Sequence, residues 1–167
     1  MPEAAPAGTS LLFLREEHIR QAQDLFFLAW RDLANTADPV LEAHGLGRAH
    51  HRALHFIARS PGLTVTDLLA MLRVTKQSLA RVLTILVEKG LVTQTQGRTD
   101  RRQRLLHLTN EGAALERALF ERQRERLLAA YREAGGPAVE GFRRVMRAIM
   151  TNSARHLLDA PAARLAK

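Results

Sequence analysis

Residues 76–89 combine an apolar helical stripe with an opposite face of hydrogen-bond donors. The stripe recurs at i, i+3, i+4 and i+7, which predicts a helix with one buried side, formed by Leu79, Val82, Leu83 and Leu86. The opposite face offers a cation, an amide, a guanidinium, a hydroxyl and one small side chain: Lys76, Gln77, Arg81, Thr84 and Ala80. Such groups donate to phosphates or to base edges in the DNA major groove. A solvated amphipathic helix shows the same pattern, so this helix alone leaves both interpretations open.

Four arginines follow at the tip of a predicted hairpin whose strand-like runs are residues 91–95 and 103–108: Arg98, Arg101, Arg102 and Arg104. Positive charge concentrated at a hairpin tip repels itself unless a polyanion or a carboxylate offsets it. Asp100 can pair with one arginine and brace the tip, which leaves the others for phosphate or minor-groove contacts. A helix with a polar face followed by a basic hairpin is the layout of a winged helix.

Capping residues predict where the neighbouring helices begin. Thr64 and Asp67 form a capping-box-like start for a short helix over 66–72, and a tight turn at Arg73 leads to Thr75, which caps the donor-bearing helix. Two short helices joined by such a turn form a helix-turn-helix. Thr109 caps a long helix that residues 135–137, Gly-Gly-Pro, end near residue 134.

Amphipathic helices are predicted on both sides of this unit. Residues 16–34 carry one apolar stripe, made of Ile19, Ala22, Phe26, Ala29, Trp30 and Leu33. Phe27 and Leu28 fall outside that stripe, so this helix needs apolar cover on a second side. Residues 35–47 are interpreted as a broken connection, residues 48–59 as a second helix, and residues 138–158 as one final helix.

Composition narrows the function classes. The net charge of +8 favours a polyanionic partner, although the excess of arginine over lysine is equally typical of a GC-rich genome. The absence of cysteine excludes disulfides, thiolate metal sites and thiol redox sensing. No apolar run reaches membrane-spanning length, so a cytoplasmic protein without membrane contact is expected. Gly-rich phosphate loops, H-E-x-x-H and nucleophile elbows are missing, which argues against an enzyme and a cofactor.

Four of the seven histidines cluster at His44, His50, His51 and His55. His51 and His55 have the i, i+4 spacing of metal ligands, but Arg52 lies on the same helix face and further ligands are missing. A structural or solvated role is therefore favoured over a metal site, and no metal is predicted.

The motifs resemble those of the MarR family of regulators. Residues 100–112 are similar to the family signature D-x-R-R-x-x-x-x-x-L-T-x-x-G, and residues 75–83 with 88–92 resemble its recognition helix. The sequence of residues 75–79 resembles a branch of the family named after the PetP regulator. The resemblance covers about residues 16–158, in the family's order of helices with the wing before the fifth.

The resemblance implies a homodimer formed by the first, fifth and sixth helices, with double-stranded DNA as the partner. It places Gln77, Ser78 and Arg81 in the major groove and assigns the wing to Arg98, Arg101, Arg102 and Arg104, with Asp100 as the brace. Thr75, Lys76 and Thr84 complete the candidate DNA-binding residues. Family members often bind small aromatic or amphipathic effectors, for which the candidate lining is Phe26, Phe27, Trp30, His50, His51 and His55. Taken one by one, these aromatics are better interpreted as core residues.

The sequence therefore predicts a mainly α fold with a small β-wing, in which dimerisation helices flank a winged helix-turn-helix core. The expected division is a disordered tail at 1–10, an N-terminal helix and connection at 11–47, a DNA-binding region at 48–109 and C-terminal dimerisation helices at 110–167. The expected function is a ligand-responsive repressor that binds a pseudo-palindromic operator. The alternatives are a helical protein-interaction module without DNA binding, and a metal- or tetrapyrrole-responsive sensor of the same fold.

Overall fold

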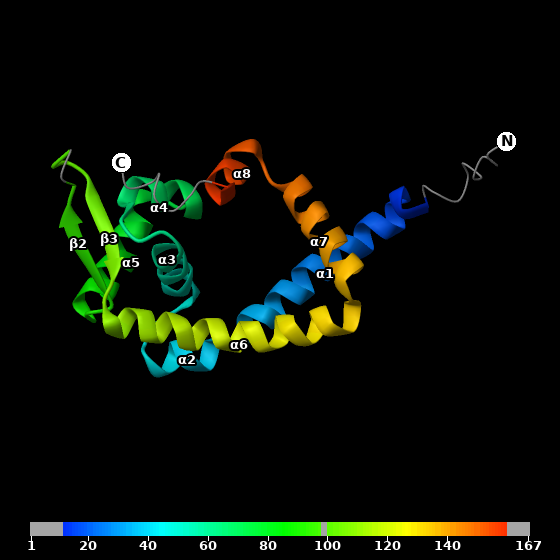
Figure 1. Cartoon of the computed structure of the whole chain (residues 1–167), viewed down its shortest axis with the longest axis horizontal. Helices are drawn as coiled ribbons and strands as arrows, with labels where there is room; N and C mark the ends of the chain where they lie inside the picture. Colours follow the sequence, from blue (N-terminus) through cyan, green and yellow to red (C-terminus); the bar gives the residue numbers. More distant parts are fainter. Residues whose placement is uncertain (1–11, 98–99, 160–167) are drawn as a thin grey trace.

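The chain is described by a computed structural model for residues 12–97 and 100–159. The fold is mainly helical with one small antiparallel sheet, as predicted (Figure 1). The predicted tail at 1–10 lies outside the described residues. In chain order the elements are a 3-10 turn (Leu12–Leu14), α1 (Glu16–Asn35), α2 (Asp38–Ala43), α3 (Arg48–Arg59), β1 (Leu63–Thr64), α4 (Val65–Leu72), α5 (Lys76–Glu88), β2 (Val92–Gln96), β3 (Arg104–Leu108), α6 (Asn110–Ala134), α7 (Gly136–Ile149) and α8 (Asn152–Asp159).

The sheet has the strand order β1-β3-β2, and both pairings are antiparallel. Val92 pairs with Leu108 at the base of the hairpin and Gln96 with Arg104 near its tip. The two-residue strand β1 joins through Leu63, which pairs with Leu106. The sequence analysis did not predict β1, because two residues are too few to show an alternating pattern.

The core of the molecule surrounds α3. Ala53, Leu54 and Ile57 are fully buried, and α3 contacts α4, α5, α6 and β3. Leu115 and Leu119, from the first half of α6, belong to the same cluster of buried residues. We call residues 48–119 the winged-helix unit. The same core also includes Ala37, Leu41 and Leu46, from α2 and the turns on either side of it.

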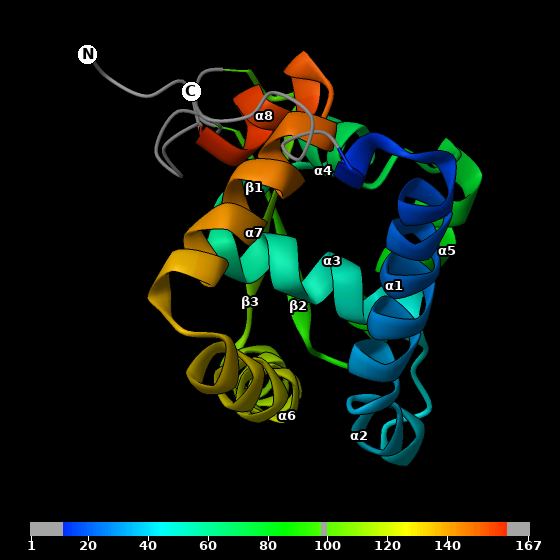
Figure 2. The same cartoon turned by 90° about the vertical axis from the view of Figure 1, so that its right-hand side faces the viewer.

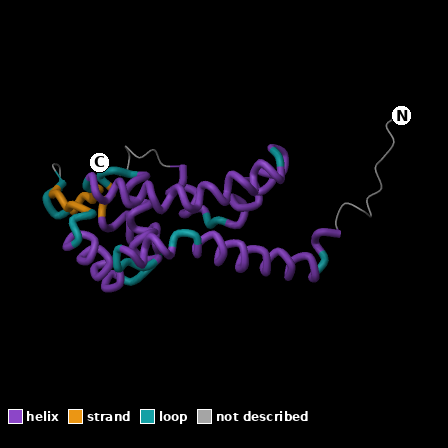
Figure 3. The backbone as a smooth tube through the Cα atoms, turned by 90° about the horizontal axis from the view of Figure 1, so that it is seen from below, coloured by secondary structure: helices purple, strands orange, loops and turns teal. Residues whose placement is uncertain are grey.

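The flanking helices α1, α7 and α8 lie outside that core. The only buried residue of α1 is Ala34, near its end, and the side chains of α7 and α8 are all at least partly exposed. Helices α1 and α7 overlap in Figure 1, but they are well separated in Figure 2. Seen from below, α1 runs on its own towards the N-terminal end (Figure 3). The long helix α6 connects the wing to α7 (Figure 1).

Two sequence predictions about helices were wrong. The segment at 35–47 contains α2, with Asp38 as its first residue; Pro39 stands in the first turn, where its missing N–H costs no helical bond. The expected single helix at 138–158 is two helices, because Met150 is extended, with ψ of 143°. Thr151 then accepts a hydrogen bond from the N–H of Ala154 and starts α8. No glycine or proline marks this break, so the sequence pattern missed it.

Candidate nucleic-acid interface

A short helix and a left-handed turn set the position of α5. The Thr64 hydroxyl oxygen accepts from the N–H of Asp67 at 3.0 Å and donates to its carboxylate at 2.6 Å, which fixes the start of α4. At the end of α4, Arg73 has φ of 50°, a left-handed conformation that turns the chain sharply. The predicted helix-turn-helix is thus formed by α4 and α5.

Helix α5 divides its surface as the sequence analysis predicted. Thr75 caps it by accepting from the N–H of Ser78 at 3.1 Å, and the two hydroxyls are 2.9 Å apart. The apolar side is buried in the core, with Leu79, Leu83 and Leu86 at most 4% exposed. The candidate contact residues on the other side are all exposed: Lys76, Gln77, Ser78, Ala80, Arg81 and Thr84.

The wing turn is held by main-chain hydrogen bonds and by one carboxylate. The N–H of Gly97 donates to the carbonyl of Gln103 at 3.0 Å, and the N–H of Gln103 donates to that of Asp100 at 3.1 Å. Asp100 also accepts from the N–H of Arg102 through its side chain, at 2.9 Å. The Asp100 carboxylate therefore braces the wing through the main chain of the turn.

The arginines of the described part of the wing are exposed to solvent. Arg101, Arg102 and Arg104 are exposed, whereas Arg98 lies outside the described residues. A hollow of about 680 Å³ lies between the wing, α5 and the start of α4. It is lined in part by Thr66, Thr84, Gln94, Arg102 and Arg104, so candidate residues from the helix and from the wing share one surface.

The sequence analysis missed Thr64, Thr66 and Gln94 as lining residues of this hollow. Thr66 is exposed in the first turn of α4, where unpaired N–H groups and the helix dipole favour an anion. A hydroxyl in a helix first turn is a signal that the sequence contained. The position of Gln94 depends on the pairing of β2 with β3, which brings it opposite Leu106.

A close contact joins the base of the wing to α6. The hydroxyl of Thr109 donates to the carbonyl of Gly90 at 2.7 Å and accepts from the N–H of Gly112 at 3.0 Å. A Cβ atom on Gly112 would lie 1.9 Å from the carbonyl oxygen of Leu91, so only glycine fits there. This geometry explains the spacing L-T-x-x-G at residues 108–112.

The histidine cluster is divided among several local contacts. The Nδ1 atom of His50 accepts from the N–H of Gly47 at 3.0 Å, which caps α3 and leaves the buried Nε2 atom without a partner in the described structure. The Nδ1 atom of His55 lies 3.7 Å from a carboxylate oxygen of Glu116 on α6. Burial lowers the pKa of His50, His51 and His55, which favours the neutral ring. His44 contacts the carbonyl of Val40 at 2.9 Å.

Within residues 12–97 and 100–159, no three His, Cys, Asp or Glu side chains lie together in a group that could hold a metal ion. The same part of the chain contains no helix long and apolar enough to cross a membrane.

The aromatic side chains of α1 are not core residues of this chain. Phe26, Phe27 and Trp30 are 39%, 72% and 59% exposed. Their interpretation as ordinary core residues was therefore wrong for the single chain. The reason is that α1 leaves the winged-helix unit, and the part of α1 that carries these rings is not covered by it (Figure 1).

A helix-turn-helix followed by a basic two-stranded wing defines the winged helix-turn-helix class of proteins. Residues 44–103 match the model of the MarR family. Over 151 residues, 90% of this chain and 91% of the relative, the chain is 54% identical to the HTH-type transcriptional regulator PetP of Rhodobacter capsulatus. The chain belongs to the MarR family; it is a transcriptional regulator and not an enzyme.

Two further similarities are to a repressor and to a solved structure. The chain is 30% identical over 95 residues, 57% of its length and 62% of the relative, to the homoprotocatechuate degradative operon repressor of Escherichia coli. Its fold is similar to the crystal structure of a mutant MarR from E. coli complexed with operator DNA. The TM-score is 0.62 at 21% identity, covering 84% of this chain and 99% of the other.

Proposed function

We propose that this regulator represses transcription by binding a pseudo-palindromic DNA operator as a homodimer. The observation that carries the proposal is the shared surface of α5 and the wing, where Thr84, Arg102 and Arg104 border one hollow. Guanidinium and hydroxyl groups in this arrangement suit the phosphates and base edges of a DNA duplex. The operator complex of the similar MarR structure supports DNA as the partner.

The candidate residues take different roles in this proposal. Gln77, Ser78 and Arg81 lie on the exposed face of α5 and read base edges in the major groove. Arg101, Arg102 and Arg104 on the wing contact phosphates or the minor groove, with Arg98 as a further candidate. Asp100 keeps the turn in shape through the main chain of Arg102. Thr75 and Lys76 lie at the start of α5, where a phosphate meets unpaired N–H groups.

The flanking helices supply the dimer interface. Large apolar side chains are exposed on α1 and α7, among them Phe27, Leu28, Phe142, Val145 and Ile149. Exposed apolar surface of this extent marks a protein interface. We assign residues 11–47 and 110–167 to dimerisation and residues 48–109 to DNA binding, with the first half of α6 also part of the core of the winged-helix unit.

The regulatory part of the proposal is an effector that weakens DNA binding. The similarity to a repressor of a degradative operon supports the repressor part of the proposal. Phe26, Phe27 and Trp30 on α1 remain the proposed effector-lining aromatics, and His50, His51 and His55 on α3 remain the further candidates. A coupling of about 1–3 kcal/mol between effector and DNA would lower DNA affinity roughly 5–150-fold.

Titration of the protein with the DNA upstream of its own gene, at several salt concentrations, tests the DNA-binding proposal. Arg81→Ala should cost roughly 1–3 kcal/mol on a specific duplex and less on random DNA, because a base edge loses its donor. Arg101→Ala should weaken both and reduce the salt slope by about 0.9 for each phosphate that is no longer neutralised. Arg52→Ala, exposed on α3, is the matched control. Binding that is independent of salt, or equal losses of affinity on both duplexes for both variants, would contradict the proposal.

A further inference from the structure

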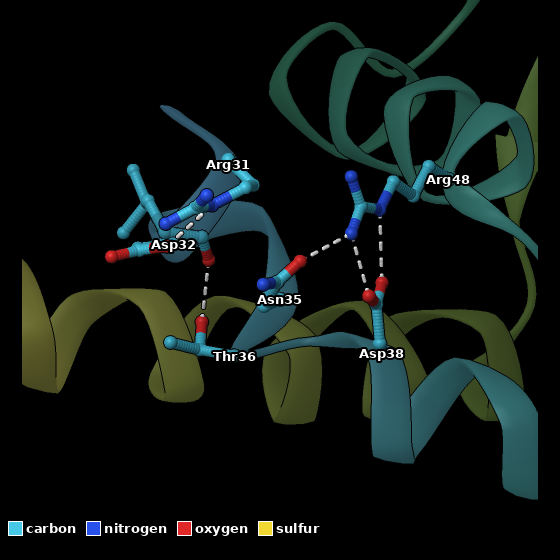
Figure 4. Close-up of polar contacts among 7 residues, drawn as sticks. Arg31, Asp32, Asn35, Thr36, Asp38 and Arg48 are labelled. Carbon is cyan, nitrogen blue, oxygen red and sulfur yellow. Dashed lines mark hydrogen bonds and ion pairs between the residues drawn. The ribbon is translucent and has the colours of Figure 1, made fainter. Parts of the chain in front are cut away.

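Three helix ends meet at one guanidinium. Arg48, the first residue of α3, donates from Nη2 to the side-chain oxygen of Asn35 at 2.6 Å and to Asp38 at 2.6 Å. Its Nε atom donates to the second carboxylate oxygen of Asp38 at 3.0 Å. Asn35 is the last residue of α1, and Asp38 is the first of α2. Figure 4 shows the guanidinium of Arg48 between these two side chains.

Arg48 does not stabilise α3, the helix that it begins. Positive charge at a helix N-terminus opposes the helix dipole, and the first turn of α3 holds no acidic residue that would offset it. The partners of Arg48 all belong to other elements, at separations of 10 and 13 residues. The hydrogen bonds from Arg48 lower the pKa of Asp38, so the carboxylate stays ionised. The contact is therefore a joint between α3 and the α1–α2 segment.

The joint lies where α1 is attached to the winged-helix unit. Ala34 is the only buried residue of α1, and Ala37 beside it is fully buried, so α1 is attached at one end. A second polar contact connects Asp32 of α1 to Arg126 of α6, at 3.9 Å. Because α1 is 20 residues long, about 30 Å, a tilt of about 10° at its attached end moves the far end by about 5 Å.

We infer that Arg48 is a positioning residue that fixes the angle between α1 and the winged-helix unit, and thereby the spacing of the two α5 helices in the dimer. The inference rests on the dimer of the proposed function. A displacement of about 5 Å corresponds to one or two base pairs, since about 10 base pairs span roughly 34–36 Å. Arg48 therefore determines which spacing of half-sites the dimer accepts, without itself contacting DNA.

A distance measurement on the protein alone tests this inference. The chain has no cysteine, so Glu88→Cys places a single spin label at the exposed end of each α5. Electron paramagnetic resonance then gives the distance distribution between the two labels of a dimer. Arg48→Ala should broaden or shift this distribution by about 5 Å. Arg48→Lys should do the same, because lysine keeps the charge and loses the two-pronged geometry.

Two further variants distinguish a role of Arg48 in positioning α1 from a general loss of folded structure. The exchange Asp38→Arg with Arg48→Asp restores an ion pair across the joint and should return the distribution towards that of the unmodified protein. Arg52→Ala, one turn further along α3, removes an exposed arginine outside the joint and should leave the distribution unchanged. Identical distributions for Arg48→Ala and Arg52→Ala would overturn the inference, as would an exchange variant that stays as broad as Arg48→Ala.

A second measurement uses DNA. The unmodified protein selects a duplex from a random library, and base pairs are then added or removed between the half-sites. Arg48→Ala should bind duplexes changed by one base pair nearly as well as the selected one, whereas the unmodified protein and Arg52→Ala should prefer the selected spacing. A preference unchanged by Arg48→Ala would overturn the inference. If the unmodified protein selects no duplex, the proposed function fails, while the label distances still decide the role of Arg48.

Discussion

The winged-helix unit and the flanking helices use apolar side chains in opposite ways. In the winged-helix unit, most large apolar residues of α3, α4 and α5 pack into one core, and Leu54, Ile57 and Leu68 are fully buried. On α1 and α7, residues of the same type are exposed, such as Phe27 at 72% and Ile149 at 63%. The core of the first region is buried within one chain, whereas the exposed apolar side chains of the second are those that the proposed dimer would cover. In that proposal, folding and assembly depend on different parts of the sequence.

Truncation of the core should have the largest effect on stability. Leu54→Ala removes a fully buried side chain at the centre of α3 and should lower the free energy of unfolding by about 2–5 kcal/mol. Because this core belongs to one chain, the loss should be the same at low and high protein concentration. Urea unfolding at two concentrations measures it. A loss that disappears at high concentration would show that the winged-helix unit is not complete by itself.

A smaller loss of stability is expected at the contact between the base of the wing and α6. Gly112→Ala forces a Cβ atom against the carbonyl of Leu91 and should cost about 1–3 kcal/mol through backbone displacement. Gly141→Ala is the control, because its added Cβ meets no atom within 4 Å on α7. Thermal unfolding of the two variants should separate them clearly. Equal stability would mean that the contact at Gly112 is easily relaxed.

The elements that the sequence analysis missed differ physically from those it predicted. Thr75 and Thr109 cap their helices as expected, because a cap depends on residues only three positions apart. The exposed face of α5 was predictable for the same local reason. The pairing of Leu63 with Leu106 and the contact of Arg48 with Asn35 depend on the three-dimensional packing of separate elements. The sequence therefore predicted the exposed face of α5, but not the contact between Arg48 and Asn35.

Substitutions on the flanking helices should barely change the stability of a single chain. Phe27→Ser alters a 72% exposed side chain, so at low concentration the free energy of unfolding should change by less than about 0.5 kcal/mol. At higher concentration the variant should unfold earlier than the unmodified protein, because association stabilises only a chain that can pair. Urea midpoints across a dilution series, with sedimentation of the same samples, provide the measurement. A midpoint independent of concentration for both proteins would argue that these faces have no partner copy.

Mild acid should produce the smallest effect, and it should act on the winged-helix unit. Burial lowers the pKa of His51 and His55 below the ordinary value of 6.5, although Glu116 opposes the shift at His55. The unfolded chain then binds more protons than the folded one, so stability is complete above about pH 6.5 and falls as the pH drops below it. Other charges near these rings are Asp38 and Arg59.

Urea midpoints between pH 7.5 and pH 5.5 measure this dependence. The double variant His51→Gln, His55→Gln should show a flatter profile, and His18→Gln on exposed α1 serves as the control. A midpoint that rises as the pH falls, or a profile unchanged in the double variant, would contradict the direction of these pKa shifts.

The contact between Leu91 and the start of α6 should also make amide hydrogen exchange slower at the base of the wing than at its turn. The N–H of Thr109 donates to the carbonyl of Leu91 at 3.1 Å, close to the tightly packed Gly112. Separating the base of the wing from α6 would disturb the core. The amide hydrogens at this base should therefore exchange with solvent only on global or near-global unfolding. Among the described residues of the turn, the amides of Arg102 and Gln103 both donate to Asp100, and they should exchange through small local openings. We therefore expect the amides at the base of the wing to exchange more slowly than those of Arg102 and Gln103.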